Sequence, residues 1–267
     1  MTIQRRIDTD FFNPPKPRIM AHRGFSGAYP ENTLEAFEAA ASLGVQYIEL
    51  DVHMSRDGEI VVCHDPELDR TTNVSGRISE LDYATILKAD AGYNFRKADG
   101  SYPFRNRGLF VPRLSTVFSR LPHLYFVVEI KQVNPSLTGA LKEAVRKAGM
   151  ERRVLIASEH QQALDEVRAL LPSVPTNLSA LETASFFTRL ASGFGDYRPP
   201  GEALQIPPVY ESLQLVTKES IEAAHSLGLE VHVWTVNDPY EIRRLLGLGV
   251  EGIITDYPDR ALAALKA

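Results

Sequence analysis

Acidic side chains recur at every second position in two short apolar segments. One segment reads YIELDVH, and in an extended strand its Glu49 and Asp51 share one face while the apolar residues between them take the other. A second segment reads YFVVEIKQ, and the same alternation puts Glu129 and Lys131 on one face. If the two segments are neighbouring strands, three carboxylates and an ammonium group point into one interior space.

Such a cluster needs partners for its charges. Buried carboxylates without a partner are costly, so several of them must face a cation or strong hydrogen-bond donors. Oxygen ligands alone suit hard ions such as Mg²⁺ or Ca²⁺, whereas zinc usually recruits histidine or cysteine at close spacing. The residues therefore indicate either a divalent metal site or a set of interior salt bridges to Lys131 and Arg23.

Two histidines stand at the ends of short apolar runs. IMAHRG ends one run with His22 and Arg23, and IVVCHD ends another with His64 and Asp65. A lone histidine is more often structural than catalytic. Two of them beside carboxylates and an arginine, however, supply groups that titrate near neutral pH and a charge for an oxyanion. Acid–base chemistry on a phosphate ester requires this combination.

Positioning these groups requires strands that end together. Apolar runs alternate with amphipathic segments along most of the chain, which predicts parallel strands joined by right-handed crossovers. The predicted strands are 19–22, 47–53, 125–130, 154–158, 175–179, 203–207, 230–236 and 252–255. The predicted helices are 33–43, 115–121, 137–148, 160–171, 184–193, 217–227, 239–248 and 258–266. Eight such units in 267 residues predict an α/β fold, a closed (β/α)8 TIM barrel, with an open doubly wound sheet as the alternative.

Two regions interrupt the alternation. Residues 1–17 show no helical or strand period and end in the Pro-rich NPPKP, which predicts an N-terminal surface arm ahead of a single domain at 18–267. Residues 54–112 form a predicted insertion after the second strand, with an Asp-Gly hairpin signal and a short helix near 79–88. This insertion is rich in aromatic residues and arginines.

The composition narrows the class of protein. A net charge of −5 with scattered lysines and arginines lacks the basic surface that nucleic-acid binding needs. The single cysteine, Cys63, excludes an internal disulfide framework, and its strand face, opposite that of His64, predicts a core position. No stretch approaches the roughly 18 apolar residues of a membrane helix, and the N-terminus lacks a secretory signal, so we expect a cytoplasmic protein without an integral membrane segment. The oligomeric state stays open, a homo-oligomer included.

The motifs resemble those of the glycerophosphodiester phosphodiesterase family, a branch of the phospholipase-C-like phosphodiesterases on a (β/α)8 barrel. The resemblance extends over about residues 19–260 and rests on fragments in the family's order. The fragments are HRG at 22–24, PENT at 30–33, ELD at 49–51, HD at 64–65 with DRTT at 69–72, EIK at 129–131, WTVN at 234–237 and TDYPD at 255–259. Each fragment alone is weak, but the ordered set is highly specific.

The resemblance implies a role for each matching residue. By resemblance, the ligands of one divalent cation, Mg²⁺ or Ca²⁺, are Glu49, Asp51 and Glu129. The implied general base and acid are His22 and His64. The implied substrate-binding residues are Arg23 and Lys131 for the phosphate, Asn32 for the metal or phosphate surroundings, and Trp234 for the glycerol.

The implied reaction is metal-dependent hydrolysis of a small-molecule glycerophosphodiester to sn-glycerol 3-phosphate and an alcohol. A cation and fixed donors let an anionic diester share a site with carboxylates. One histidine deprotonates either the glycerol hydroxyl of the substrate, which gives a cyclic phosphate, or a water, and the other protonates the leaving alkoxide. The sequence does not choose the nucleophile, the alcohol or the metal.

Several alternatives stay open. An aromatic, basic lip formed by the insertion would accept an acyl chain and make the substrate a lysophospholipid, although these aromatics more often pack the insertion's own small core. A barrel that only binds a phosphorylated ligand or a metal is the alternative to an enzyme. His53 is assigned either to the site or to its rim, His232 is expected in the core, and Asp256 is expected to cap or orient the loop before the last helix.

Overall fold

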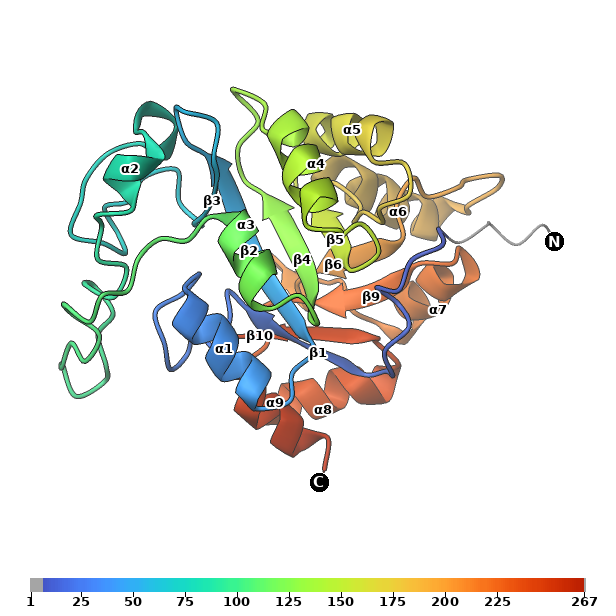
Figure 1. Ribbon diagram of the computed structural model, residues 1–267. Coiled ribbons are helices and arrows are strands. Elements are labelled where there is room, and N and C mark those ends of the chain that lie inside the picture. Colours follow the sequence, from blue (N-terminus) through green and yellow to red (C-terminus); the bar gives the residue numbers. More distant parts are fainter. Residues whose placement is uncertain (1–6, 267) are drawn as a thin grey trace.

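The strands of the main sheet form a barrel and run parallel to one another. The computed structural model describes residues 7–266, and Figure 1 shows the strands surrounded by helices. The strands are β1 (Arg18–His22), β2 (Tyr47–Met54), β3 (Ile60–Val62), β4 (Tyr125–Ile130), β5 (Val154–Ala157), β6 (Ala203–Ile206), β7 (Val209–Tyr210), β8 (Leu213–Gln214), β9 (Glu230–Val233) and β10 (Gly252–Thr255). The main sheet has the order β5-β4-β2-β1-β10-β9-β6, and each neighbouring pair in it is parallel. β3 pairs antiparallel with β2, and β7 pairs antiparallel with β8.

Two residues close the barrel between β5 and β6. Thr176 makes a parallel bridge to Ile156, and Asn177 makes one to Ala203. The N–H of Asn177 donates to the carbonyl of Ile156 (3.2 Å), and the N–H of Ala203 donates to the carbonyl of Thr176 (3.3 Å). The fifth predicted strand is therefore present only as this short bridge. Because the bridge joins both edges of the sheet, the closed (β/α)8 prediction is confirmed and the open sheet is excluded.

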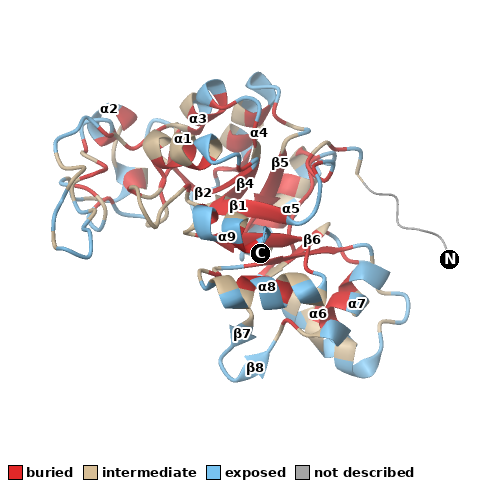
Figure 2. Ribbon diagram, turned by 90° about the horizontal axis from the view of Figure 1, so that it is seen from below, coloured by how far each residue is buried: buried red, intermediate tan, exposed pale blue. Residues whose placement is uncertain are grey.

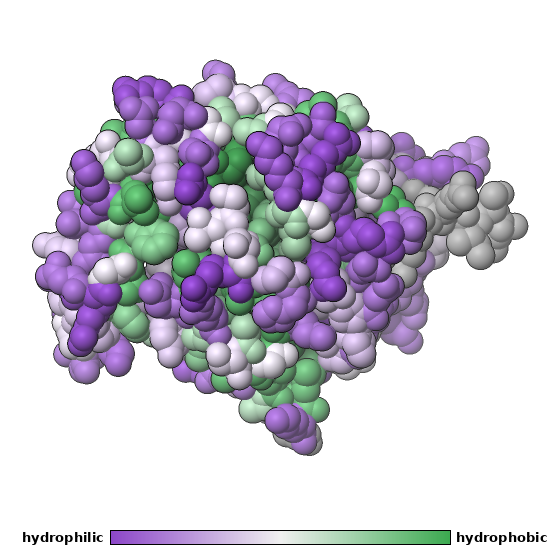
Figure 3. Space-filling view, in the orientation of Figure 1, coloured by the Kyte–Doolittle hydropathy of each residue, from purple (hydrophilic) through white to green (hydrophobic). Residues whose placement is uncertain are grey.

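Helices cover the outside of the barrel. They are α1 (Leu34–Ser42), α2 (Tyr83–Ile86), α3 (Leu114–Arg120), α4 (Thr138–Lys147), α5 (Gln161–Leu170), α6 (Ala180–Ser192), α7 (Lys218–Ser226), α8 (Pro239–Leu248) and α9 (Pro258–Ala264), with a 3₁₀ turn η1 (Ile78–Glu80). Figure 2 shows buried strands and helices exposed on their outer sides, and Figure 3 shows hydrophilic residues over much of one outer face with apolar areas between them. The helices therefore bury apolar stripes against the sheet.

One helix boundary differs clearly from the prediction. α6 begins at Ala180 rather than at 184. The Ser179 hydroxyl accepts the N–H of Glu182 (3.1 Å), and the Glu182 carboxylate accepts the N–H of Ser179 (2.9 Å). This reciprocal capping box satisfies two N–H groups that a helix start leaves free, so the helix begins there.

Along each strand of the barrel, alternate side chains lie on opposite faces of the sheet. One set packs between the sheet and the helices, and the other fills the interior, or lumen, of the barrel. From β2, Ile48, Leu50 and Val52 are fully buried in the layer between sheet and helices. The lumen instead holds Tyr47 at its closed end, with Met20 from β1. The period of two therefore assigns Glu49 and Asp51 to the lumen, as the sequence predicts.

Part of the predicted N-terminal arm seals the closed end of the barrel. Phe11 is 0% exposed and lies edge-on to Tyr47, with 5.2 Å between the ring centroids. The hydroxyl of Tyr47 donates to the carbonyl of Phe11 (2.5 Å). The prediction of a surface arm is therefore wrong for Phe11 and Phe12, which are buried, whereas residues 15–17 are exposed; residues 1–6 lie outside the described chain. The segment lacks a period because it packs as a loop with a few anchoring aromatics.

The insertion has its own small core. Its hairpin forms as predicted, with Met54 of β2 opposite Ile60 of β3, and η1 and α2 occupy the predicted helical region near 79–88. Val61, Leu68 and Ile78 are buried in a cluster separate from the barrel core. Cys63 belongs to that cluster, and burial raises its pKa to about 12, so its prediction as a core residue is confirmed. Among residues 7–266, no helix combines the length and apolar character needed to cross a bilayer.

Candidate active site

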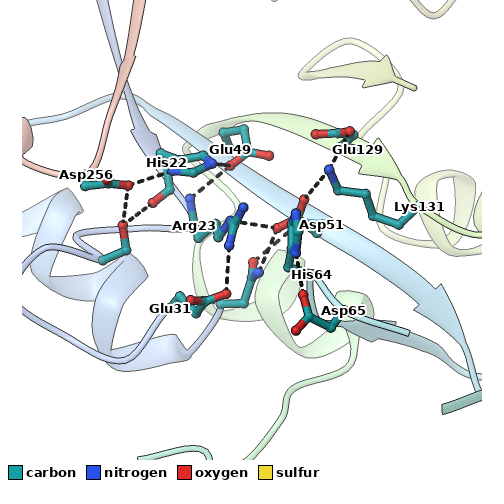
Figure 4. Close-up of polar contacts among 12 residues, drawn as sticks. His22, Arg23, Glu31, Glu49, Asp51, His64, Asp65, Glu129, Lys131 and Asp256 are labelled. Atoms are coloured by element: carbon teal, nitrogen blue, oxygen red, sulfur yellow. Dashed lines mark hydrogen bonds and ion pairs between the residues drawn. The ribbon is translucent and has the colours of Figure 1, made fainter. Parts of the chain in front are cut away.

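The chemistry-bearing side chains meet where the parallel strands end. His22 lies opposite Glu49 in the β1–β2 register, and Asp51 lies opposite Glu129 in the β2–β4 register. Their side chains gather at the carboxyl ends of these strands (Figure 4). This end of a (β/α)8 barrel is where enzyme active sites are built.

Three carboxylates form the centre of the cluster. Glu49, Asp51 and Glu129 each place an oxygen within 4.8 Å of the others. Burial, reinforced by the charge of Asp51, raises the pKa of Glu49, and burial raises the pKa of Glu129 against the opposing charge of Lys131. Asp51 Oδ1 is buried and accepts no hydrogen bond from the described residues. Burial and mutual repulsion thus disfavour the ionised forms of these carboxylates. A set of oxygen ligands in this situation fits a hard divalent cation.

Two cations flank the carboxylates without balancing them. Lys131 Nζ lies 2.6 Å from Glu129 Oε1 and 3.3 Å from Asp51 Oδ1. Arg23 Nε lies 3.3 Å from Asp51 Oδ2, but Arg23 Nη1 also donates to Glu31 (2.9 Å). The interior salt bridges foreseen as an alternative to a metal site do exist. Because Arg23 is shared with a further carboxylate, they leave the cluster with excess negative charge.

The loop after β1 is shaped to aim its backbone and side chains at the cluster. Arg23 (φ 53°) and Asn32 (φ 56°) both have left-handed backbone conformations. The N–H of Arg23 donates to Glu49 Oε2 (2.9 Å), and Asn32 Nδ2 donates to Asp51 Oδ2 (2.9 Å). Gly24 is required because a Cβ there would lie 2.7 Å from the carbonyl carbon of Ala36. The HRG motif thus brings Gly24 close to α1 and places Arg23 in contact with the carboxylates of Glu49 and Asp51.

Each of the two histidines is held by its own carboxylate. His22 Nδ1 lies 2.6 Å from Asp256 Oδ1, and His64 Nδ1 lies 2.6 Å from Asp65 Oδ1. An ionised carboxylate only accepts hydrogen bonds, so each Nδ1 carries a proton and each Nε2 is left for proton transfer. His22 Nε2 lies 3.9 Å from Glu49 Oε2. Burial disfavours the imidazolium form of His22, but Asp256 and Glu49 outweigh it and raise the pKa of this ring.

The glycerophosphoryl diester phosphodiesterase family model matches residues 22–260. The chain belongs to this family. A glycerophosphodiester phosphodiesterase of Bacillus altitudinis is 32% identical over 92% of this chain and 96% of its own length. An Oleispira antarctica phosphodiesterase, solved with its product sn-glycerol-3-phosphate, superposes with a TM-score of 0.76 at 25% identity, over 94% of this chain and 98% of that one. A mouse protein named lysophospholipase D is 26% identical over 91% of this chain and 84% of its own length. Family membership makes the chain a phosphoric diester hydrolase.

Of the two roles predicted for Asp256 of this phosphodiesterase, capping the last helix is wrong. Its side chain does not cap α9, whose first turn receives no side-chain cap. Asp256 Oδ1 instead accepts from His22 and from Ser26 (2.9 Å), while Oδ2 accepts from Asn237 (2.7 Å). Burial opposes the ionised form, yet these contacts lower the pKa of Asp256 to about 2. The TDYPD motif was a signal for the contact between Asp256 and His22, because β10 neighbours β1 and so brings the two residues together.

The remaining predicted positions lie at or below this end of the barrel. Trp234 directly follows β9 and is 37% exposed. His53 is buried and donates from Nε2 to the carbonyl of His64 (3.0 Å), so it fixes the backbone beside a site residue. His232 is fully buried and contacts Gln205 and Glu230, as expected of a core histidine.

Proposed function

We propose that the chain hydrolyses glycerophosphodiesters to sn-glycerol 3-phosphate and an alcohol, using one divalent cation and two histidines. The observation that carries this proposal is that a carboxylate cluster with excess negative charge lies beside two imidazoles, each held at Nδ1 by a carboxylate and neither hydrogen-bonded at Nε2 within the described residues. A non-catalytic binding barrel has no need for paired groups that accept and donate protons. The solved relative with bound sn-glycerol-3-phosphate supports the same product.

The first task of the site is to bind an anionic diester beside carboxylates. Arg23 and Lys131 supply donors for the phosphate oxygens, and Asn32 keeps Asp51 in place through its amide. Glu49, Asp51 and Glu129 would hold Mg²⁺ or Ca²⁺. When bound, such an ion neutralises charge on the phosphoryl group and lowers the pKa of a coordinated hydroxyl.

The second task is to move two protons. His22 Nε2 faces the carboxylate cluster and would accept the proton of the attacking hydroxyl, which belongs to a water or to the substrate's glycerol. In the second case a water must then open the cyclic phosphate to give sn-glycerol 3-phosphate. His64 Nε2 would donate a proton to the leaving alkoxide. Asp256 and Asp65 keep each ring oriented, and Asp256 also stabilises the protonated form of His22. Trp234, exposed beside the site, offers a surface for the glycerol.

Release of sn-glycerol 3-phosphate from glycerophosphocholine tests the proposal. We expect EDTA to abolish release and Mg²⁺ or Ca²⁺ to restore it. Release that EDTA does not affect would contradict the role of the cation. No release with either metal, together with binding of glycerol phosphate, would favour the non-catalytic barrel. A cytoplasmic location and use of small-molecule rather than nucleic-acid substrates remain predictions from composition.

A second candidate substrate class is the lysophospholipids, favoured by an exposed apolar rim. The rim consists of Val209, Tyr210, Leu213 and Trp234, which are 46%, 59%, 63% and 37% exposed. The β7–β8 hairpin follows the carboxyl end of β6, and the N–H of Trp234 donates to the carbonyl of Ile206 (3.2 Å), so the rim lies at the end of the barrel that carries the site. Figure 2 shows the hairpin exposed and projecting from the barrel.

The aromatic side chains of the insertion make contacts with one another and with Arg105. The Arg105 guanidinium lies over the rings of both Tyr93 and Tyr102, at 4.2 and 3.7 Å from their centroids. Phe104 packs against Phe95 and against Tyr29 of the loop after β1. These aromatics are therefore largely engaged with one another, and the rim is the better candidate for an acyl chain.

Comparing lysophosphatidylcholine with glycerophosphocholine as substrates tests this second candidate. If the rim holds an acyl chain, Tyr210→Ser and Leu213→Ser should lower kcat/KM for the lysophospholipid and leave the soluble diester unchanged. Leu43→Ser is the matched control, because Leu43 is 40% exposed at the end of α1, on the opposite end of the barrel. Equal losses on both substrates, or none, would remove the rim from substrate selection.

A further inference from the structure

Arg70, in the insertion, joins two carboxylates that belong to different segments. Its Nε and Nη2 donate to Asp65 (2.5 and 3.3 Å), next to His64. Its Nη1 and Nη2 donate to Glu31 (both 2.8 Å), in the loop after β1. One guanidinium therefore makes a forked contact to a carboxylate on each side.

Each of the two carboxylates that Arg70 contacts is in turn hydrogen-bonded to a residue of the candidate site. On one side, Asp65 holds His64 Nδ1 at 2.6 Å. On the other, Glu31 accepts from Arg23, whose Nε lies 3.3 Å from Asp51. Figure 4 shows both ends of this chain of groups, with Arg23 and Glu31 at one end and His64 and Asp65 at the other. Arg70 is the link between them.

The geometry suits arginine and no other cation. A planar guanidinium presents its donors as a fixed fork that matches two carboxylates, whereas the ammonium of lysine is a single point of charge. Burial opposes ionisation of Asp65, but the hydrogen bonds from Arg70 and His64 lower the pKa of this carboxyl to about 2. Asp65 therefore stays ionised and keeps accepting from the imidazole.

We propose that Arg70 is a positioning residue for the leaving-group half of the reaction. By fixing Asp65 it holds the His64 ring in the orientation that protonates the departing alkoxide, and by engaging Glu31 it ties the insertion to the loop that carries Arg23. The inference rests on the proposed function and goes beyond it in assigning Arg70 the role of holding Asp65 and of tying the insertion to the loop after β1.

Two substrates separate this role from general damage to the site. The alcohol of glycerophosphocholine must be protonated as it leaves, whereas 4-nitrophenol leaves a 4-nitrophenyl glycerol phosphodiester as a stable anion. Loss of an oriented acid lowers the rate by roughly a factor of 10 or more where protonation matters. Arg70→Gln should therefore lower kcat for glycerophosphocholine by at least about tenfold and change kcat for the aryl diester by less than about threefold. Arg70→Lys should recover only part of the loss.

Arg56→Gln is the matched control. Arg56 also makes a forked contact to one carboxylate, that of Asp82 (2.9 and 2.5 Å), in the same region of the chain, but neither residue contacts the two site histidines. Both substrates should be turned over by this variant as by the unaltered protein. Equal losses on the two substrates in Arg70→Gln would overturn the proposal and leave the proposed function standing.

A readout without turnover keeps the two conclusions separable. The Nδ1 proton that His64 shares with Asp65 should give a downfield proton resonance, assigned by its loss in His64→Ala. Arg70→Gln should broaden or remove that resonance while the corresponding His22 resonance persists. An unchanged His64 resonance would overturn the positioning role. A protein that hydrolyses neither substrate would refute the proposed function, and the resonance would still test the link.

Discussion

Ionisable side chains are buried at both ends of the barrel lumen, but only at one end are the carboxylate charges balanced by cations. At the closed end Arg18 and Glu230 are 1% and 2% exposed and lie 2.5 Å apart, and Lys16 lies 3.2 Å from the same glutamate. Burial opposes ionisation of Glu230, yet His232 and these cations lower its pKa to about 2. At the open end the pKa values of Glu49 and Glu129 are raised.

The contrast separates a structural ion cluster from a functional one. Burial of charge is common to the two ends and does not mark function. The raised pKa values of Glu49 and Glu129 indicate that their neighbours leave these carboxylates in need of a cation, whereas the lowered pKa of Glu230 indicates a carboxylate that its neighbours already satisfy. The charges at the closed end are balanced by described residues, whereas those at the open end fit the cation proposed above.

The largest expected effect is on catalysis at the open end. Glu49→Gln should lower kcat/KM for glycerophosphocholine by about a thousandfold, which corresponds to about 4 kcal/mol of lost transition-state stabilisation. The metal-free protein should be no less stable, because the change removes a buried charge beside Asp51. Calorimetric metal titration and urea unfolding measure the two effects. Turnover within tenfold of the unaltered enzyme would remove Glu49 from the ligand set.

The matching change at the closed end should act on stability instead. Glu230→Gln leaves Arg18 buried without its charged partner and should cost about 3 kcal/mol of unfolding free energy, with kcat unchanged for the folded fraction. The folded-state pKa lies below the ordinary value of 4.5, so the contribution of Glu230 is complete above that value and is lost as the pH falls toward 2.

Urea unfolding of this pair of proteins across pH checks the assignment. The difference between the unaltered protein and Glu230→Gln should be constant from pH 7 to pH 5 and shrink below it. A difference that grows as the pH falls would contradict the lowered pKa. A loss of kcat equal to that of Glu49→Gln would erase the distinction between the two ends.

A smaller effect is expected where the open end orients a histidine. Asp256→Asn removes the negative charge that fixes His22 Nδ1–H and replaces one of its two acceptor oxygens with a donor, so it should lower kcat by about a hundredfold with little change in KM. Asp259→Asn serves as the control, since Asp259 is an exposed acidic residue in the first turn of α9. Steady-state kinetics of both variants measures the difference, and similar kcat values would refute the orienting role.

The smallest expected effect is stabilisation by the cation itself. At a free concentration about ten times its Kd, a bound ion adds about 1.4 kcal/mol, which raises Tm by about 4 °C for a chain of this size. Thermal unfolding after removal of metal should show this rise in the unaltered protein and in Glu230→Gln, but not in Glu49→Gln. The same rise in Glu49→Gln would place the ion elsewhere.

The period-two pattern was sufficient to predict most of the fold and the centre of the site. Alternation in YIELDVH assigns Glu49 and Asp51 to the lumen, and the structure places them there with Glu129. The fifth strand was poorly predicted because closure there needs hydrogen bonds from only two residues, Thr176 and Asn177, which leave almost no pattern. The β7–β8 hairpin went unpredicted for the same reason, as each strand has two residues.

The partners of the site residues could not be read from the sequence. Asp256 reaches His22 across 234 positions, and Glu31 reaches Arg70 across 39. Such contacts depend on which strands become neighbours and on how a long insertion folds back, and both are settled by tertiary packing. Phe11 is a similar case, because only the closed barrel provides the surface that buries it.

The two histidines differ in the part of the architecture that supports them. His22 ends β1 and Asp256 directly follows β10, both strands of the barrel, whereas His64 and Asp65 lie in the insertion between β2 and β4. In the mechanism proposed above, activation of the nucleophile and protonation of the leaving alcohol therefore depend on separate parts of the chain. An exchange of residues 55–112 between relatives would then replace the proposed acid and leave the proposed base, His22, in place.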